Sequence, residues 1–424
     1  MPGNSGQGAE SGNNQPLDGW KEIASWFGRD VRTVSRWEQK RGLPIHRLPG
    51  GGRGSVFAYP AELEAWKNRQ ADLLANGHTP AAHQWRWAGL AVGLALIAAL
   101  GLSLTRATTI HTVVAGPQEL RAVDASGKAI WTHAFSNRLH AFSQEKLARR
   151  LRLQDLDGDS QPEVLFAAAY HTGGIPSREE LLCFDSAGRL RWRYQPNLRL
   201  AYRGRTFDTN WGFLDLEAGA GGIWAALIEA PWWGGALVRL DAAGRPELRF
   251  VSSGMIYRLA VMDSGLILAG GVNNEYAAPF FAVVGQDDPP VSSPQTPGSR
   301  YECLECPDSR PRRFFVLPNS ELAKPYGMPY SNMELIHVRP NEVLVETGHG
   351  DFSQFLFRFS LDFQPLEVMP SASFRLRHDE YQRAGKLDHG YETCPQLAKP
   401  ALLREWTPSG WREMQVPWRL PVRP

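Results

Sequence analysis

The pattern of hydrophobic and polar positions divides the chain into four segments. Residues 1–16 consist mainly of Gly, Asn, Ser and Pro, a composition that buries too little apolar surface to fold. Apolar residues then recur at helical spacing, and residues 87–104 form one continuous apolar run. Past Arg106 the apolar residues come in short β-type runs separated by turn residues. We therefore expect a disordered tail (1–16), a small helical domain (17–77), an isolated apolar helix (85–105) and a large β domain (106–424).

The continuous apolar run has the length and flanks of a membrane-spanning helix. Ser103 is its only polar side chain, and its eighteen residues at about 1.5 Å each extend roughly 27 Å, close to the ~30 Å of a bilayer core. Tryptophan and arginine residues flank it, as at membrane interfaces. Gly89 and Gly93 have the spacing of close helix packing, which would suit a homodimer, although glycine is also simply frequent in membrane helices.

The small helical domain carries an excess of positive charge. Residues 1–86 hold eleven Lys and Arg against eight Asp and Glu, and the rest of the chain is nearly balanced. A helix that stops at Gly28 and a second helix capped by Asp30 form a helix-turn-helix arrangement. The polar face of the second helix offers guanidinium and hydroxyl groups that can contact DNA. The candidate DNA-binding residues are Arg29, Arg32, Thr33, Ser35, Arg36 and, in a glycine-rich hairpin tip, Arg53.

These motifs resemble a known family. GRDVRTVSRWE is similar to the recognition helix, and GGGRGSVFAY to the wing, of the winged helix-turn-helix of the MerR and excisionase-like group. The resemblance implies DNA contacts for Arg32, Thr33, Arg36 and Arg53. The dimerising coiled coil of MerR proteins does not follow Gln70, so the mode of dimerisation stays open. A small helical domain that binds a protein instead of DNA is the alternative.

The large β domain carries an internal repeat. VDASGKAIW, FDSAGRLRW and LDAAGRPELRF each place an Asp, two small residues and a Gly between two strand-like runs. We predict that Asp124, Asp185 and Asp241 begin tight turns in which the Gly takes positive φ. The repeat resembles the blades of PQQ-like, quinoprotein-type β-propellers, which implies an all-β, propeller-like domain.

An acidic segment of the same domain suggests a calcium site. LQDLDGDSQPEVLFAA offers alternating oxygen ligands suited to a hard cation. The candidate ligands are Asp155, Asp157, Asp159, Gln161 through its carbonyl, and Glu163. The segment resembles the calcium loop of FG-GAP and VCBS-type propeller repeats and implies one bound calcium ion. Ser160 stands where that family has Gly, so we expect a left-handed residue at a cost of about 1 kcal/mol. The alternative is an acidic turn that merely ends a strand.

The remaining chemistry is sparse. Cys303 and Cys306 form a single CxxC, and Cys183 and Cys394 complete the cysteines. In an oxidising compartment a structural disulfide is the economical interpretation, and its connectivity stays open. The sequence contains no recognisable nucleophile elbow, phosphate loop, zinc-spaced histidines or paired carboxylates, so we expect no enzymatic activity.

The predicted fold class is multi-domain, with a small α-helical winged helix-turn-helix, a single transmembrane helix and an all-β, propeller-like extracytoplasmic domain. This organisation predicts a membrane-anchored one-component transcriptional regulator in the inner membrane of a bacterium. Its N-terminus would bind DNA in the cytoplasm, and its C-terminal domain would sense or bind an unknown ligand or protein outside. The alternative is a surface or periplasmic scaffold, or an adhesion-type propeller protein, whose cytoplasmic domain anchors it to a protein.

Overall fold

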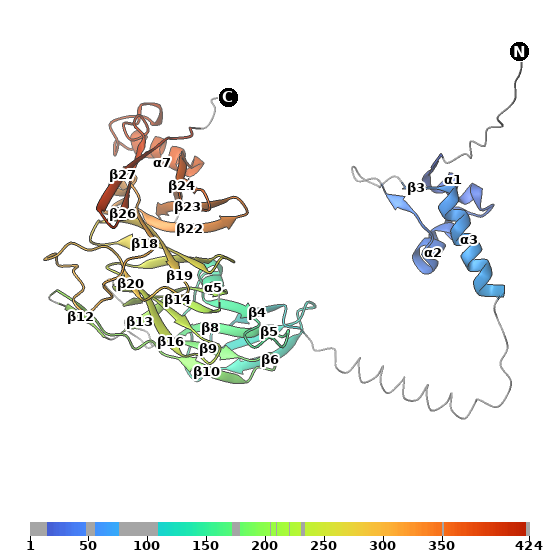
Figure 1. The fold of residues 1–424 in the computed structure, drawn as a ribbon, viewed down its shortest axis with the longest axis horizontal. Helices are drawn as coiled ribbons and strands as arrows, with labels where there is room; N and C mark the ends of the chain where they lie inside the picture. The colour runs from blue at the N-terminus through green and yellow to red at the C-terminus, as the bar shows by residue number, and fades with distance from the viewer. Residues whose placement is uncertain are drawn as a thin grey trace, which may run out of the picture. The chain divides into compact units, whose positions relative to one another are not determined.

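The fold is given by a computed structural model that divides into two compact units, Met1–Arg106 (unit 1) and Ala107–Pro424 (unit 2). The structure describes residues 15–47, 56–75, 109–171, 179–203, 205–208, 210–219, 221–229, 234–349 and 352–420. Unit 1 combines short helices and short strands, whereas unit 2 is built of β-sheets (Figure 1).

Unit 1 packs its helices against a small antiparallel sheet with strand order β1-β3-β2. Its elements are β1 (Leu17–Asp18), α1 (Gly19–Trp26), α2 (Val31–Arg41), β2 (His46–Arg47), β3 (Val56–Ala58) and α3 (Pro60–Ala75). The Asp30 carboxylate accepts a hydrogen bond from the Thr33 N–H at 2.8 Å and caps α2, as the sequence predicts. Ile23, Val34 and Leu63 are fully buried and anchor one apolar core.

The first half of unit 2 supplies two antiparallel sheets, a two-stranded hairpin and most of a third large sheet. The first sheet consists of β4 (Thr112–Ala115), β5 (Glu119–Val123) and β6 (Ala129–Ala134). The helix α5 (Gln144–Arg149) leads to the second sheet of β7 (Leu151–Gln154), β8 (Glu163–Ala169), β9 (Glu179–Phe184) and β10 (Leu190–Tyr194). The hairpin β11 (Leu200–Tyr202) and β12 (Arg205–Phe207) precedes the third sheet of β13 (Trp211–Gly219), β14 (Gly222–Glu229), β15 (Gly234–Leu240), β16 (Pro246–Ser252) and β20 (Val291–Ser292).

The second half contains two further sheets and the C-terminal helices. The fourth sheet consists of β17 (Ile256–Val261), β18 (Leu266–Asn273), β19 (Ala278–Gly285), β21 (Arg313–Val316), β26 (Ala401–Thr407) and β27 (Gly410–Val416). The fifth consists of β22 (Asn332–Arg339), β23 (Glu342–His349), β24 (Phe352–Phe359) and β25 (Pro365–Pro370). The helical segments are α6 (Ala323–Tyr326), α7 (Ala372–Arg383) and η1 (Tyr391–Thr393).

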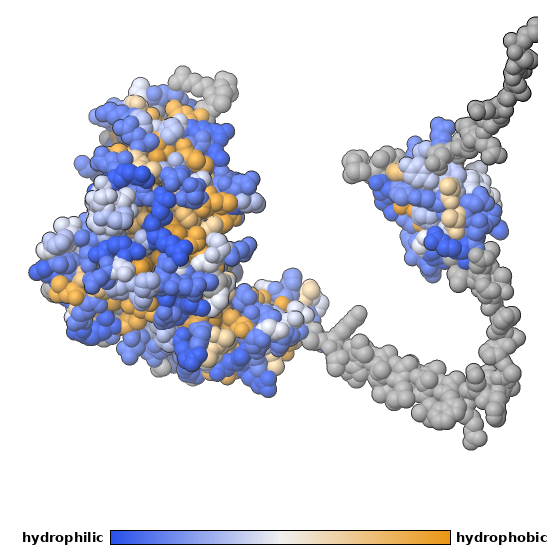
Figure 2. Space-filling view, in the orientation of Figure 1, coloured by the Kyte–Doolittle hydropathy of each residue, from blue (hydrophilic) through white to orange (hydrophobic). Residues whose placement is uncertain are grey.

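Apolar clusters fill the space between successive sheets of unit 2. One cluster joins the first and second sheets, a second joins the second and third, and two more continue to the fifth sheet. The central strands β8 and β19 are buried along their whole length, which explains their nearly continuous apolar sequences. On the face shown in Figure 2, hydrophilic residues cover much of unit 2 and hydrophobic residues lie between them.

The three predicted D-x-x-G turns are present. The N–H groups of Gly127, Gly188 and Gly244 donate to the carbonyls of Asp124, Asp185 and Asp241, and the three glycines have φ of 82°, 83° and 77°. A Cβ at Gly188 would lie 2.6 Å from the ring of Trp131, and one at Gly244 would lie 2.5 Å from the ring of Trp192. The tryptophan of each of the first two repeats therefore packs on the turn of the next one.

The predicted fold class is corrected by the structure. The proposed membrane helix (85–105), with Gly89 and Gly93, lies outside the described residues, and no helix in the described ranges is both long and apolar enough to cross a bilayer. The predicted single-pass location in the inner membrane therefore has no support. The described chain is predominantly β, and the described sheets of unit 2, with three, four, two, five, six and four strands, differ from the equal blades expected of a PQQ-like or FG-GAP propeller. The last two strands, β26 and β27, return to the fourth sheet after the fifth is complete.

Candidate functional site

The predicted DNA-binding residues lie around α2 of unit 1. Arg29 is in the turn before α2, Arg32, Thr33, Ser35 and Arg36 are on α2, and Arg53 is outside the described residues. Arg32 and Arg36 are exposed. The Thr33 hydroxyl donates to the Asp30 carboxylate at 2.8 Å, so it already has a partner within its own helix. Contact of these residues with DNA stays a prediction.

Four of the predicted calcium ligands lie in the connection between β7 and β8, Glu163 is the first residue of β8, and neighbouring protein groups already contact their carboxylates. Asp155 accepts hydrogen bonds from the N–H groups of Gly158 (2.7 Å) and Ser160 (2.9 Å). Asp159 accepts one from the N–H of Gln161 at 2.7 Å. The segment is thus held by its own backbone amides, and Ser160 has the expected positive φ, 65°.

The prediction of a calcium site is wrong for two reasons, a positive charge beside the predicted ligands and a group of donors elsewhere that suits a different metal. The Arg191 guanidinium of β10 donates to Asp157 at 2.7 Å and to Glu163 at 2.9 Å, so a fixed positive charge serves two of the five predicted ligands. Asp155, Asp157 and Asp159 still lie within 4.8 Å of one another, but a mixed group of nitrogen, sulfur and oxygen donors lies elsewhere in unit 2. Such donors suit a transition metal better than calcium. The contacts of the acidic segment fit the alternative, an acidic turn that ends a strand.

The mixed donor group, here called the Glu-His-His-Cys cluster, consists of Glu321, His378, His389 and Cys394. One ligand atom from each residue lies within 4.8 Å of the others. Oε1 of Glu321 lies 3.2 Å from Nε2 of His378 and 2.7 Å from Sγ of Cys394. Its other oxygen, Oε2, lies 3.2 Å from Nε2 of His389. The carboxylate therefore contacts all three of the other ligands.

Three parts of the chain position these side chains. Glu321 lies between β21 and α6, where its backbone N–H donates to Gln396 at 2.9 Å. His378 is on the buried face of α7, which begins where Ser371 accepts the Phe374 N–H at 2.9 Å. His389 and Cys394 follow α7, and Cys394 is the residue directly after η1.

The cluster is buried and polar. His378 has no exposed surface, and Cys394 is 3% exposed. Nδ1 of His378 and Nε2 of His389 make no hydrogen bond with any residue that the structure describes. Nε2 of His389 still lies 3.2 Å from Oε2 of Glu321, so Nδ1 of His378 is the buried polar atom left without a partner among the described residues, and such an atom is costly.

Neighbouring groups favour the protonated forms of two of these side chains. The Asp388 carboxylate lies 2.7 Å from Nδ1 of His389 and raises the pKa of that imidazole. A proton held on Nδ1 leaves Nε2 as the atom that faces the cluster. Burial raises the pKa of the Cys394 thiol to about 12, and the thiol donates to Glu321.

No sequence motif predicts this cluster. His378, His389 and Cys394 fall within seventeen residues, in the pattern H-x10-H-x4-C, which is wider than the ligand spacing of common zinc motifs. Glu321 precedes His378 by 57 residues. The available signal was a histidine at helical spacing from Phe374 and Tyr381, on the apolar face of a capped helix.

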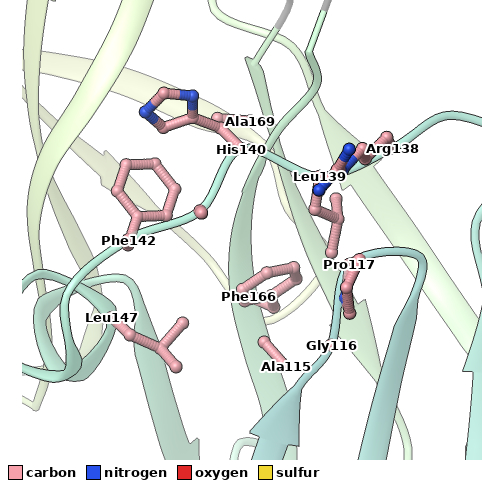
Figure 3. Close-up of a pocket in the computed structure, with 11 residues that line it drawn as sticks. Ala115, Gly116, Pro117, Arg138, Leu139, His140, Phe142, Leu147, Phe166 and Ala169 are labelled. Carbon is pink, nitrogen blue, oxygen red and sulfur yellow. The ribbon is translucent and has the colours of Figure 1, made fainter.

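A separate apolar pocket lies between the first and second sheets. Leu139, Phe142, Leu147 and Phe166 converge on a cavity of about 180 Å³, and Arg138 and His140 stand beside it (Figure 3). The Arg150 guanidinium lies 4.4 Å from the centre of the Phe142 ring and braces that wall. The pocket can take a small apolar group, but its walls offer few polar contacts.

The disulfide connectivity that the sequence left open is Cys303–Cys306. Cys183 and Cys394 are free thiols, and both are buried. The CxxC therefore forms a local disulfide in the loop between β20 and β21, and neither of its cysteines belongs to the Glu-His-His-Cys cluster.

No family model matches the chain, and no curated protein sequence matches it either. Among solved structures it is similar to a protein of unknown function from Bacteroides caccae, at 11% identity and a TM-score of 0.29, over 62% of this chain and 78% of that one. A tryptophan-to-alanine variant of the apocarotenoid oxygenase of Synechocystis aligns at 11% identity and a TM-score of 0.28, over 85% of this chain and 77% of that one. The cobalt-substituted form of that oxygenase aligns at 11% identity and a TM-score of 0.29, over 71% and 66%. TM-scores this low carry no argument about fold or activity.

These findings correct the functional predictions. The resemblances to the MerR and excisionase-like group and to FG-GAP and PQQ-like propellers are wrong for this chain, because no family model matches it and its described part is predominantly β. The membrane-anchored transcriptional regulator and the alternative of a surface scaffold or adhesion protein lose their basis with those resemblances. Some of the similar structures are enzymes, but a likeness this small says nothing about the activity of this chain, and the expectation of no enzymatic activity stays a prediction.

Proposed function

We propose that unit 2 binds one transition-metal ion, zinc by its donor set, through Glu321, His378, His389 and Cys394. The single observation that carries this proposal is the convergence of one carboxylate, two imidazoles and one thiol within 4.8 Å. Zinc takes these donor types at about 2.0–2.3 Å, so tetrahedral ligand atoms lie about 3.4 Å apart. The contacts of 2.7–3.2 Å around Glu321 are close to that spacing.

The order of the ligands along the chain supports a structural role. Glu321 follows β21, whereas His389 and Cys394 lie in the segment that leads from α7 to β26. β26 pairs with β21. A bound metal would therefore link the segment between α7 and β26 to the residues that follow β21. Four protein ligands would fill a tetrahedral ion and leave no open position, which favours a structural rather than a catalytic site.

Metal binding would reverse the protonation of the thiol. A metal ligand must be deprotonated, so Cys394 would release its proton as zinc replaces the hydrogen bond to Glu321. Asp388 would hold the imidazole of His389 as the outer partner of a carboxylate–histidine–metal arrangement. Gln396, which accepts the Glu321 N–H and donates to the Asn319 carbonyl at 2.7 Å, would hold the backbone of the carboxylate ligand.

The test is the metal content of the full chain produced with added zinc. We expect about one zinc per chain, and cobalt substitution should give a thiolate-to-cobalt absorption band. Cys394→Ser should remove that band, and His378→Ala and His389→Ala should each lower the metal content. Cys183→Ser is the matched control, because Cys183 is equally buried and far from the cluster in sequence. Wild-type metal content in both histidine variants would reject the proposal.

A further inference from the structure

A second cavity between the first and second sheets is polar. It measures about 300 Å³, at the lower end of small-molecule sites. Six of its lining side chains are used below. His133 is on β6 of the first sheet, and Phe135 and Asn137 follow that strand; Tyr170 follows β8, Glu180 is on β9 and Arg193 is on β10. Four separate segments of the chain therefore meet around one space.

The central group of this cavity is the buried carboxylate of Glu180. Glu180 is 4% exposed, and its Oε1 accepts the Tyr170 hydroxyl at 2.6 Å. Its Oε2 is buried and accepts no hydrogen bond from any residue within the described ranges. The nearest positive charge is Nη1 of Arg193, 3.7 Å from Oε2, too far for a hydrogen bond. A carboxylate oxygen in such surroundings needs a donor, because an unmet buried acceptor is costly.

The other walls limit which donor can enter. A cationic ligand would face the exposed Arg193 guanidinium, and an anionic ligand would face the Glu180 carboxylate. Burial and the charge of Arg193 lower the pKa of His133, so its ring is neutral at neutral pH. Phe135 contacts that ring edge-to-face with the ring centroids 4.9 Å apart, and the two rings form an apolar wall.

We propose that this cavity binds a neutral polyhydroxylated small molecule, such as a monosaccharide or a cyclitol. Hydroxyl groups of the ligand donate to Oε2 of Glu180 and accept from the Arg193 guanidinium, so one uncharged ligand satisfies both members of the loose ion pair. The ring C–H face of the ligand packs against His133 and Phe135. Asn137, which is exposed at the rim, offers an amide to a further hydroxyl.

The test is ligand-observed saturation-transfer NMR on the full chain, with D-glucose and myo-inositol as polyol probes at millimolar concentration. Ethanolamine and acetate serve as charged probes. We expect saturation transfer to at least one polyol and weaker transfer to both charged probes. Glu180→Gln should weaken polyol binding about tenfold, because an amide nitrogen can replace the accepting oxygen but cannot accept a hydrogen bond.

Arg193→Gln keeps the proposal testable if Glu180→Gln fails to fold, because Arg193 is exposed. Its expected effect is about threefold weaker binding, since the guanidinium contributes at the surface. Glu413→Gln, an exposed substitution on β27, is the matched control and should leave binding unchanged. Polyol binding should also persist in His378→Ala, so a failure of the proposed metal site would not affect this result. Tighter binding of ethanolamine or acetate than of either polyol, no binding of any polyol probe, or equal polyol binding by wild type and both cavity variants would overturn the proposal.

Discussion

Two groups of potential metal ligands in unit 2 differ in how their charges are balanced. Asp155, Asp157 and Asp159 lie in one turn, where backbone N–H groups and the Arg191 guanidinium already serve the carboxylates. Glu321 and its histidine and cysteine neighbours come from three parts of the chain, and no guanidinium among the described residues forms an ion pair with Glu321. A closely spaced set of acidic residues therefore does not by itself make a metal site, whereas a buried set of mixed donors without a fixed guanidinium charge can.

The difference also concerns burial. His378 and Cys394 are buried, and two imidazole nitrogens of the Glu-His-His-Cys cluster lack hydrogen-bond partners in the described part of the chain. Asp157 and Asp159 are exposed, so water can solvate any carboxylate oxygen that the turn leaves free. Only the buried cluster pays a lasting free-energy penalty without a bound ion. Metal removal should therefore affect the two regions very differently.

Metal removal should have the largest effect on the stability of unit 2. At a free zinc concentration of a thousand times Kd, binding adds about 4 kcal/mol to the free energy of unfolding. We expect a chelator to lower Tm by on the order of 10 °C. Thermal unfolding followed by circular dichroism, with and without chelator, measures this shift.

The control for metal removal uses the acidic turn. Asp155→Asn combined with Asp157→Asn should leave the chelator-dependent shift in Tm at its wild-type size. His378→Ala should abolish the shift. If the double variant loses the chelator-dependent shift in Tm and His378→Ala keeps it, the metal binds at the acidic turn and not at the Glu-His-His-Cys cluster.

The buried carboxylate of Asp215 should make the stability of unit 2 depend on pH. Asp215 on β13 is 3% exposed and accepts the N–H groups of Leu216 (3.1 Å) and Leu259 (2.9 Å), while Nη2 of Arg152 is 3.7 Å away. Burial raises its pKa to about 7. The folded state therefore keeps a proton that the unfolded state releases near pH 4, and stability falls as pH rises from about 4 through about 7.

The measurement for Asp215 is the free energy of unfolding in urea across this pH range, with chelator present so that metal binding does not contribute. We expect a loss on the order of a few kcal/mol in wild type and a flatter profile in Asp215→Asn. Asp241→Asn is the control. Backbone and side-chain hydrogen bonds lower the pKa of Asp241, so its contribution is lost only as pH falls in the acid range. An unchanged slope in Asp215→Asn would contradict the assignment.

The sequence predicted features that depend on adjacent residues. The turns at Asp124, Asp185 and Asp241 need only an Asp that accepts nearby N–H groups and a Gly that takes positive φ, so their geometry followed from the motif. The cap of α2 by Asp30 was predictable for the same reason. Local chemistry of this kind is written in a few consecutive residues.

The sequence could not predict features that depend on tertiary contacts. Arg191 reaches Asp157 and Glu163 across 34 and 28 residues, and this guanidinium changes how the acidic turn must be interpreted. Glu321 and Cys394 are 73 residues apart, and their contact depends on β26 returning to β21. Neither pairing leaves a periodic pattern in the sequence, whereas the locally spaced aspartates do, so the sequence points to the acidic turn and not to the Glu-His-His-Cys cluster.

Removal of the guanidinium from the acidic turn should have an intermediate effect. Glu163 is 2% exposed, so Arg191→Met leaves a buried carboxylate whose remaining hydrogen-bond donor within the described ranges is the Leu156 N–H at 2.8 Å. We expect a loss of about 2 kcal/mol, less than for a fully buried pair because Arg191 is partly exposed. Urea unfolding measures the loss. Arg191→Met combined with Glu163→Gln should recover part of it, and a double variant no more stable than the single one would argue against a charge effect.

The smallest expected effect is a gain of stability at Ser160. Its φ of 65° places a side chain in the left-handed region, at a cost of about 1 kcal/mol that glycine avoids. Ser160→Gly should therefore raise the free energy of unfolding by about 0.5–1 kcal/mol, after the greater flexibility of the unfolded chain is offset. Ser160→Ala keeps the strained backbone and should give no gain. Asn210→Gly is the matched control, since Asn210 has φ of 61° but asparagine tolerates this region better, so its gain should be smaller. Equal gains at both positions would show that backbone strain in the acidic turn is not specific to its serine, and the turn would then differ from the Glu-His-His-Cys cluster in charge balance and burial alone.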